Sequence, residues 1–284
     1  MKASGRRHGV MASLRSYWNW KASNVASATT PQRVVAPPRA APTSSQSLDV
    51  FLHTVNERRS TKRFDSSRPV DLALVARLLE TSTRAPTAFN LQPWVAVAVH
   101  EESQRAALSH AALSQPQPRD APVSVVFAGD MEPERRAPAA LELGLNTGYY
   151  GSRYGATYLR LVYYHLHTGP FGALAQAKSC ISSWYSSSTG TPLLTVPTTM
   201  KGYAWKQAMI PATTFLYAAA AAGLDTAIIE GFDEEKVRGV VGLPESYTVP
   251  VIISVGYAKV DKSTKTAVRS PRFSTNTLIR WNKF

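Results

Sequence analysis

Three short apolar runs constrain the fold of this chain most strongly. They are WVAVAVH (94–100), PVSVVFAG (122–129) and VPVIISVGYA (249–258), and each has the length and β-rich composition of a buried strand. Helical segments separate them without a regular strand–helix–strand rhythm. No GxGxxG or GxxxxGK[ST] turn is present. We therefore expect an α+β fold rather than a doubly wound parallel sheet, and any nucleotide must be bound by another kind of site.

Helical patterns surround the predicted strands. Ser47 can cap one helix, and a second begins at Asp71 with apolar residues on one face. A long helix is expected at 205–224, with Gly223 suited to its C-terminal cap. Pro211 should kink this helix or mark its first turn, because proline lacks the N–H that a helix interior needs.

Residues 131–203 lack clear periodicity. They contain helical patches at 139–145, 158–167 and 173–184 among Gly, Ser and Tyr clusters. Long irregular stretches are commonly functional. We expect this stretch to be a lid or variable insert within one domain, 47–284, that ends in a C-terminal arm at about 259–284.

The net charge of +13 is unevenly distributed. Residues 1–48 carry seven Lys and Arg and no acid, which leaves +6 for the rest of the chain. That moderate charge fits anionic small molecules as well as it fits DNA. The acid-free segment is rich in Arg, Ser, Ala and Pro, the composition of an organelle transit peptide. We expect 1–46 to be a disordered extension with a mitochondrial targeting signal, the alternative being an untargeted basic tail.

Several classes of site find no support in the composition. The single cysteine, Cys180, excludes an internal disulfide and an all-cysteine metal site, and the six histidines form no HExxH pair. We therefore expect no metal. No run approaches the roughly 18 apolar residues of a membrane span, so no span is expected.

The basic segment NERRSTKRFD (56–65) is the first candidate site. Arg58, Ser60 and Lys62 alternate, so an extended backbone would place a guanidinium, a hydroxyl and an ammonium on one side. A phosphate monoester prefers such donors. A solvated charge run is the alternative, because Lys/Arg runs mostly lie on surfaces.

Two further segments carry polar groups at defined places. In APTAFNLQPW (85–94), two prolines fix the backbone, and Asn90 and Gln92 can both donate and accept hydrogen bonds, as recognition of a planar heterocycle requires. In IIEGF, Glu230 and Gly231 follow a predicted strand, and glycine permits close approach to a ligand. The alternative for 85–94 is an ordinary polar loop. The alternative for IIEGF is a tight turn that needs glycine for its positive φ.

Taken together, these segments resemble the FMN-dependent nitroreductase family. RRSTKRF (58–64) resembles RRSxRxF, APTAFNLQPW resembles APSxxNxQPW, and AAGLDTAIIEGFD (221–233) resembles the family's PIEGFD segment. A final VGYA strand with an Arg-Ser-Pro element (269–271) is a weaker match. The resemblance covers about residues 47–130 and 203–275. Thr87 stands where serine is usual, and Ile228 where proline often precedes Ile-Glu-Gly.

The resemblance implies a role for each matching position. Arg58 and Ser60 would hold the FMN phosphate and ribityl chain, and Lys62 would lie near flavin N1 and O2, where a cation stabilises the reduced flavin. Arg269 would be a second phosphate contact, with Arg272 a weaker candidate. The implied cofactor-binding residues are Arg58, Arg59, Ser60, Lys62, Pro86, Thr87, Asn90, Gln92, Ile229, Glu230, Gly231 and Arg269.

The resemblance also implies a fold and a reaction. The fold would be a three-layer α/β/α sandwich with a central, mostly antiparallel sheet, long central helices and an intertwined homodimer. Bound FMN would take hydride from NADH or NADPH and reduce a nitroaromatic or quinone by two electrons in a ping-pong cycle, without a catalytic side chain. With the basic N-terminus, the closest description is a mitochondrial, oxygen-insensitive (type I) nitroreductase of unicellular eukaryotes.

Two alternatives stay open. Other flavoenzymes of this fold are dehalogenases, flavin-degrading enzymes or heterocycle dehydrogenases, and the variable segment 131–203 would decide among them. A basic nucleic-acid-binding protein is the alternative of a different class, but no nucleic-acid module is recognised and the 85–94 and 228–232 segments stay unexplained.

Overall fold

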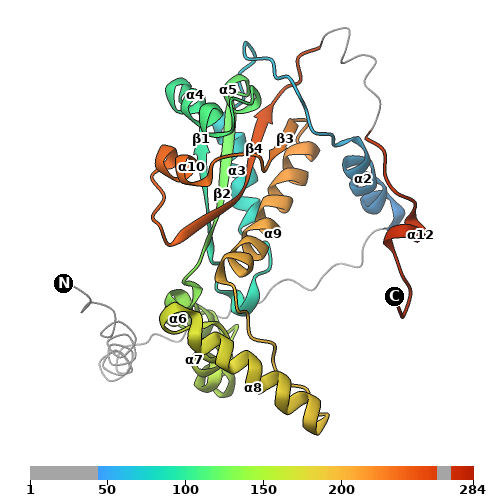
Figure 1. Ribbon diagram of the computed structural model, residues 1–284. Coiled ribbons are helices and arrows are strands. Elements are labelled where there is room, and N and C mark those ends of the chain that lie inside the picture. The colour runs from blue at the N-terminus through green and yellow to red at the C-terminus, as the bar shows by residue number, and fades with distance from the viewer. Residues whose placement is uncertain (1–43, 261–269) are drawn as a thin grey trace, which may run out of the picture. The chain divides into compact units, whose positions relative to one another are not determined.

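The computed structural model describes residues 44–260 and 270–284, which form two compact units (Figure 1). The sheet unit comprises the described residues of Ala40–Ala88, Gln92–Met131 and Met200–Phe284. The helical unit comprises Phe89–Leu91 and Glu132–Thr199. The predicted variable segment at about 131–203 thus forms most of a compact unit, while its role as a lid stays a prediction.

The sheet unit is built on a four-stranded antiparallel sheet of order β1-β2-β4-β3. Its strands are β1 (Trp94–Val99), β2 (Val123–Asp130), β3 (Asp225–Ile229) and β4 (Tyr247–Gly256). β2 is buried along its whole length because helices cover both faces of the sheet. The α+β class and the mostly antiparallel central sheet are both confirmed.

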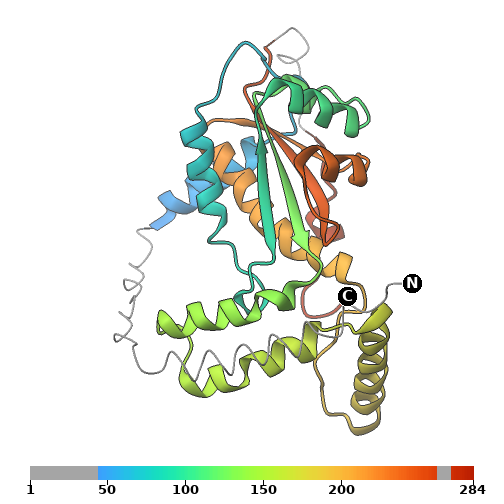
Figure 2. The same ribbon diagram turned by 90° about the vertical axis from the view of Figure 1, so that its left-hand side faces the viewer.

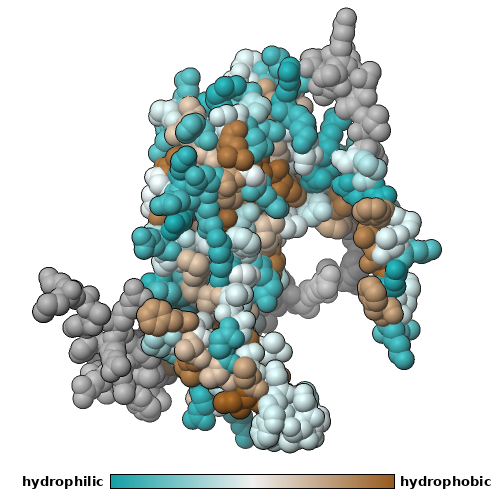
Figure 3. All heavy atoms as spheres, in the orientation of Figure 1, coloured by the Kyte–Doolittle hydropathy of each residue, from teal (hydrophilic) through white to brown (hydrophobic). Residues whose placement is uncertain are grey.

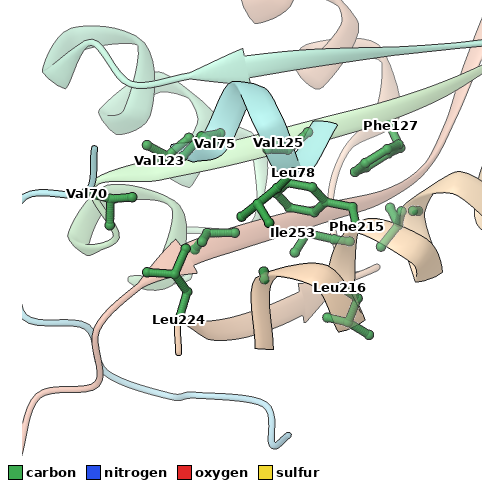
Figure 4. Close-up of a cluster of buried hydrophobic side chains, with 14 residues drawn as sticks. Val70, Val75, Leu78, Val123, Val125, Phe127, Phe215, Leu216, Leu224 and Ile253 are labelled. Atoms are coloured by element: carbon green, nitrogen blue, oxygen red, sulfur yellow. The ribbon is translucent and has the colours of Figure 1, made fainter. Parts of the chain in front are cut away.

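Helices form a layer on each face of this sheet (Figures 1 and 2). On one face, α3 (Leu72–Ser82) and α9 (Met200–Ala221) pack against alternate strand residues, as Figure 4 shows for Phe215, Val125 and Ile253. On the other face lie α4 (Glu102–Ala111), α5 (Gln117–Asp120) and α10 (Glu234–Val241), over the intervening strand residues. The predicted three-layer α/β/α arrangement is therefore confirmed.

The first helix begins earlier than the sequence predicted. α2 runs over Ser44–Glu57, so Ser47 lies inside it and is not its cap. It contacts α9 through the rings of Phe51 and Tyr217, which meet edge to face at 6.1 Å. In α3, by contrast, the predicted cap is confirmed: Asp71 accepts a hydrogen bond from the N–H of Ala73 at 2.8 Å.

α9 is the longest described helix, with 22 residues. It begins at Met200 rather than at 205, so Pro211 is a buried interior residue and the first-turn interpretation was wrong. The helix ends as predicted around Gly223, whose φ is +74°. The N–H of Gly223 donates to Ala220 and that of Leu224 to Ala219, which closes a Schellman motif with Leu224 buried beneath it.

The helical unit contains α6 (Ala137–Asn146), α7 (Ser152–Leu166) and α8 (Ala173–Thr189), coloured green to yellow in Figure 1. The three helical patches predicted in this segment fall within or directly against these helices. α7 buries one stripe, Tyr158, Val162 and Leu166, at four-residue spacing. The Gly, Ser and Tyr clusters between the helices obscured this periodicity in the sequence.

Candidate functional site

The basic segment lies along the outer edge of β3, the last strand of the sheet. Ser60 pairs in parallel with Thr226, and the N–H of Thr61 donates to the Thr226 carbonyl at 2.8 Å. The chain then crosses the end of β4, where Phe64 pairs with Ala258. Residues 60–64 therefore extend one edge of the sheet and hold the basic side chains there.

The structure shows the predicted alternation for part of the segment. Thr61 is buried, and its hydroxyl donates to an Asp225 carboxylate oxygen at 3.4 Å, while Ser60 and Lys62 are exposed. The backbone at Arg58 is different, because its N–H still donates to the Thr54 carbonyl one helical turn back. The bridge to β3 begins at Ser60, and the alternation of Arg58 with Ser60 and Lys62 stays a prediction.

Arg58 has unused hydrogen-bonding capacity. Its guanidinium is half-buried, and the Nη1 nitrogen is fully buried with no hydrogen-bond partner among the described residues. A buried cationic donor without a partner is costly, and a bound anion would satisfy it. The residue predicted to hold the FMN phosphate thus has a free donor, so Arg58 fits that group. Arg59, by contrast, is exposed.

The loop between α3 and β1 has an unusual backbone. Phe89, Asn90 and Gln92 have φ angles of 54°, 51° and 49°, the left-handed region that non-glycine residues rarely adopt. Within the sheet unit, the N–H of Gln92 donates to the Thr87 hydroxyl at 2.9 Å. Residues in such conformations persist only where their surroundings hold them, and they cluster at functional sites.

Gln207 of α9 also holds this loop. Its side-chain oxygen accepts a hydrogen bond from the N–H of Ala88 at 2.9 Å, and the residue is buried. No sequence pattern indicates this role, because a single Gln in a long helix is ordinary. Pro86 is exposed and Thr87 is half-buried, so both remain within reach of a ligand.

The third segment lies at the other end of β3. Ile229 is buried in the core beside Ile252 and Val237, so only its backbone can reach a ligand. Glu230 is exposed, and the Gly231 carbonyl accepts a hydrogen bond from Gln115 Nε2 at 2.7 Å. The sequence did not predict Gln115 as part of this turn.

Gly231 does not need a glycine-specific backbone. Its φ lies outside the left-handed region, unlike that of Gly223. A Cβ added here would meet only Gln115 Nε2 within 4 Å, at 3.4 Å, which is ordinary contact. The tight-turn alternative considered for this glycine is therefore wrong, and close approach of a ligand remains as a reason for it.

The structure brings two of the three predicted segments to one strand. Ser60 lies beside Thr226 near the start of β3, and Glu230 follows its end. Glu230 follows Thr226 by four residue steps, or roughly 13 Å of extended chain. An elongated ligand could therefore extend along this edge. The Thr226 hydroxyl, which the sequence analysis overlooked, is buried there without a hydrogen-bond partner within the described ranges.

The remaining predicted residues are placed differently. Asn90 belongs to the helical unit. Arg269 lies outside the described residues. Arg272 is exposed and donates to the carbonyls of Ser270 and Pro271 at 3.3 and 2.9 Å.

A surface cavity of about 460 Å³ in the sheet unit is lined by residues of α9, α10 and β4, among them Lys201, Glu234 and Thr248. None of the predicted cofactor-binding residues lines it. In the described part of the chain, no group of three or more His, Cys, Asp and Glu side chains could hold a metal ion. No helix of that part is long and apolar enough to cross a membrane.

Comparison with known proteins places this site in a family. The model of the family described as "Nitroreductase family" matches residues 55–257. A protein of Thermus thermophilus named "NADH dehydrogenase" is 30% identical over 201 residues, 71% of this chain and 83% of its own. "Putative NAD(P)H nitroreductase YodC" of Bacillus subtilis is 24% identical over 81% of this chain and 98% of its own.

Solved structures share the fold. A protein of Exiguobacterium sibiricum solved in complex with FMN is 20% identical, covers 81% of this chain and 96% of its own, and has a TM-score of 0.62. A nitroreductase family protein of Streptococcus pneumoniae is 23% identical, covers 81% of this chain and 99% of its own, and has a TM-score of 0.60. The family match includes the basic segment, the strained loop and the turn after β3, so this chain belongs to the Nitroreductase family.

Proposed function

We propose that this protein is an FMN-dependent NAD(P)H oxidoreductase that reduces nitroaromatics or quinones by two electrons. The observation that carries the proposal is the buried, unpartnered Nη1 of Arg58, next to a segment that pairs with β3. FMN, when bound, would accept hydride from the nicotinamide cofactor and deliver two electrons to the substrate. The names of the Thermus and Bacillus relatives and the FMN complex of a structural neighbour support the proposal.

The residues would act by binding and positioning. Arg58 would donate to the phosphate, with Ser60 as a hydroxyl donor and Lys62 as an exposed cation that favours an anionic partner. The amides of Asn90 and Gln92 would bind a planar heterocycle. At the far end of β3, the backbone at Ile229 to Gly231 would line the cofactor.

We also propose a homodimer, supported by exposed apolar residues of the sheet unit. Leu48, Val50 and Phe51 of α2 are 53–62% exposed, and Figure 3 shows hydrophobic side chains at the surface where α2 lies. The C-terminal segment exposes Phe273, at 78%, and Trp281, at 86%. Exposed apolar patches of this kind commonly mark protein–protein interfaces.

A mitochondrial location is a further proposal, because the acid-free, Arg- and Ser-rich residues 1–48 have the composition of a transit peptide. Fusing residues 1–46 to a fluorescent protein tests it in a eukaryotic cell. The proposal predicts mitochondrial fluorescence, and uniform cytosolic fluorescence would contradict it.

The proposed reaction is tested on the purified full chain. The protein should be yellow and should release FMN on denaturation. NADH and NADPH oxidation should then be measured with a nitroaromatic, a quinone and a halotyrosine. Turnover of the first two supports the proposal, whereas turnover of the halotyrosine alone would assign a dehalogenase. A colourless protein that binds no added FMN would refute both.

A further inference from the structure

Two tyrosine hydroxyls converge on one backbone carbonyl in the helical unit. Tyr158 Oη donates to the Phe89 carbonyl at 2.7 Å, and Tyr150 Oη donates to the same oxygen at 3.1 Å. A carbonyl oxygen has two lone pairs, so both bonds can exist together. Phe89 is the first of the residues with left-handed backbone in the loop that carries Asn90.

Helix geometry and one glycine, Gly144, determine where these hydroxyls lie. Tyr154 and Tyr158 of α7 are four residues apart, with Tyr150 just before the helix, and the Tyr150 and Tyr158 rings lie 5.1 Å apart. Tyr150 fits because Gly144 of α6 has no side chain: a Cβ there would lie 2.0 Å from the Tyr150 ring.

Packing fixes the direction of both donors. The Tyr158 side chain is fully buried, and its ring meets that of Phe89 edge to face at 6.4 Å. The His165 ring also meets the Phe89 ring edge to face, with ring centroids 5.8 Å apart. Burial also raises the pKa of Tyr150, so this hydroxyl keeps its proton at neutral pH and can donate it.

The Phe89 carbonyl, which accepts these hydrogen bonds, belongs to a backbone segment in an unfavourable conformation. Left-handed φ angles are energetically unfavourable at non-glycine residues, and Phe89 and Asn90 adopt them in succession. Two hydrogen bonds to the carbonyl between them offset part of that cost. Without them, the loop would populate other backbone conformations.

We propose that Tyr150 and Tyr158 are positioning residues that hold the Phe89–Asn90 backbone in its left-handed conformation, so that the Asn90 amide is preorganised for the flavin. This inference rests on the proposed function, in which Asn90 contacts FMN. It links the segment 132–199, the part of the chain least readable from the sequence, to cofactor binding. Both tyrosines act through Phe89 and touch no reacting atom.

The test uses full-length Tyr150→Phe and Tyr158→Phe, which keep the rings and remove one hydroxyl each. Tyr154→Phe is the matched control: its ring contacts both other tyrosines, but its hydroxyl makes no hydrogen bond to Phe89 within the described residues. Hydrogen exchange of a peptide spanning 86–93 is measured first, without added FMN. We expect faster exchange in Tyr150→Phe and Tyr158→Phe, and wild-type exchange in Tyr154→Phe.

FMN binding is then titrated by flavin fluorescence. Each of the two variants should bind FMN about three- to tenfold more weakly, because the binding-competent loop is populated less. Tyr154→Phe should bind within about twofold of wild type. A purely structural contact would accelerate exchange without changing FMN affinity, and that result would overturn the positioning role.

The outcomes separate this inference from the proposed function. If wild type binds FMN and both variants match it, the inference alone is overturned. Unchanged exchange in the 86–93 peptide would also overturn it. If wild type binds no FMN, the proposed function fails, and the role toward the cofactor fails with it.

Discussion

Gly231 can accept a methyl group without disturbing the described fold. Its φ is not left-handed, and an added Cβ would meet only the flexible end of Gln115 at 3.4 Å. If this glycine serves close approach of the cofactor, Gly231→Ala should leave the free energy of unfolding within about 0.5 kcal/mol of wild type. FMN affinity should nevertheless fall about tenfold or more, because the methyl group would occupy ligand space.

Thermal unfolding without FMN and an FMN titration together check this prediction. Unchanged FMN affinity would show that the glycine is not required for binding. The same substitution at Gly239, inside α10 and outside the predicted cofactor-binding residues, serves as a control that should leave FMN binding unchanged.

For single residues, the sequence indicated which ones belong to the candidate site better than it indicated the surroundings of their side chains. Ser60 and Lys62 lie where an alternating segment would place them, but Arg58 retains a helical hydrogen bond that composition could not reveal. Ile229 matched a family motif, yet its side chain packs into the core. Gln207 and Tyr158 were missed because their partners are distant in sequence, and long-range contacts leave no local pattern.

The C-terminus of α9 provides a test at the scale of the secondary-structure element. Gly223 has a φ of +74° and open space around its Cβ position, so Gly223→Ala changes only backbone strain. We expect it to destabilise the protein by about 1 kcal/mol. Gly239→Ala lies inside α10, also in open space but with ordinary φ, and should stabilise by about 0.5 kcal/mol. Urea unfolding measures both, and equal effects would contradict the Schellman assignment.

Glu234 joins α10 to α9 and β4. One carboxylate oxygen accepts from the Thr248 hydroxyl and the Val249 N–H, and the other accepts from Lys201 at 2.6 Å. Burial alone would raise the pKa of Glu234, but these hydrogen bonds outweigh it and lower the pKa below its ordinary value of 4.5. The carboxylate therefore stabilises the fold above pH 4.5, and this contribution is lost as the pH falls through the lower folded-state pKa.

Glu234→Gln should consequently cost roughly 1–2 kcal/mol at pH 7, with the side chain's partial exposure limiting the loss. The difference from wild type should narrow as the pH falls below 4.5. Glu235→Gln, an exposed neighbour on the same helical turn, is the control and should have little effect. Urea unfolding at pH 7 and pH 4 measures both, and a difference that grows in acid would contradict the assignment.

Elements with a strong periodic signal were predictable, and those ordered by tertiary contacts were less so. The strands β2 and β4 were found because burial on both faces makes them continuously apolar. The start of α9 at Met200 was missed, because Pro211 suggested a boundary that packing overrides. The lengths of α7 and α8 were underestimated because Ser, Gly and Tyr dilute their apolar stripes.

At the scale of the whole molecule, the proposed dimer makes a direct prediction. Apolar side chains exposed on α2 and the C-terminal segment, including Phe51 and Trp281, would be covered by a second copy. Light scattering after size exclusion should give about twice the 31.0 kDa chain mass. A monomer that carries a full complement of flavin would contradict the proposed dimer.

The family assignment explains why an edge strand, a basic segment and a strained loop occur in one chain. Composition alone favoured a solvated charge run at 56–65. The matching segments at 85–94 and 228–232, together with the unpartnered Arg58 nitrogen, favour an anion site instead. The substrate is the least predictable property, because the segment 132–199 has no motif that reports on it.

FMN titration of full-length apoprotein, comparing wild type with Arg58→Ala, tests whether Arg58 binds the cofactor phosphate. Arg77→Ala on α3, an exposed arginine outside the predicted site, controls for the loss of one positive charge. We expect wild type and Arg77→Ala to bind FMN equally, while Arg58→Ala loses roughly 1.5–3 kcal/mol, about 10- to 150-fold in affinity. Equal FMN affinity in all three proteins would contradict the assignment of Arg58 to the phosphate.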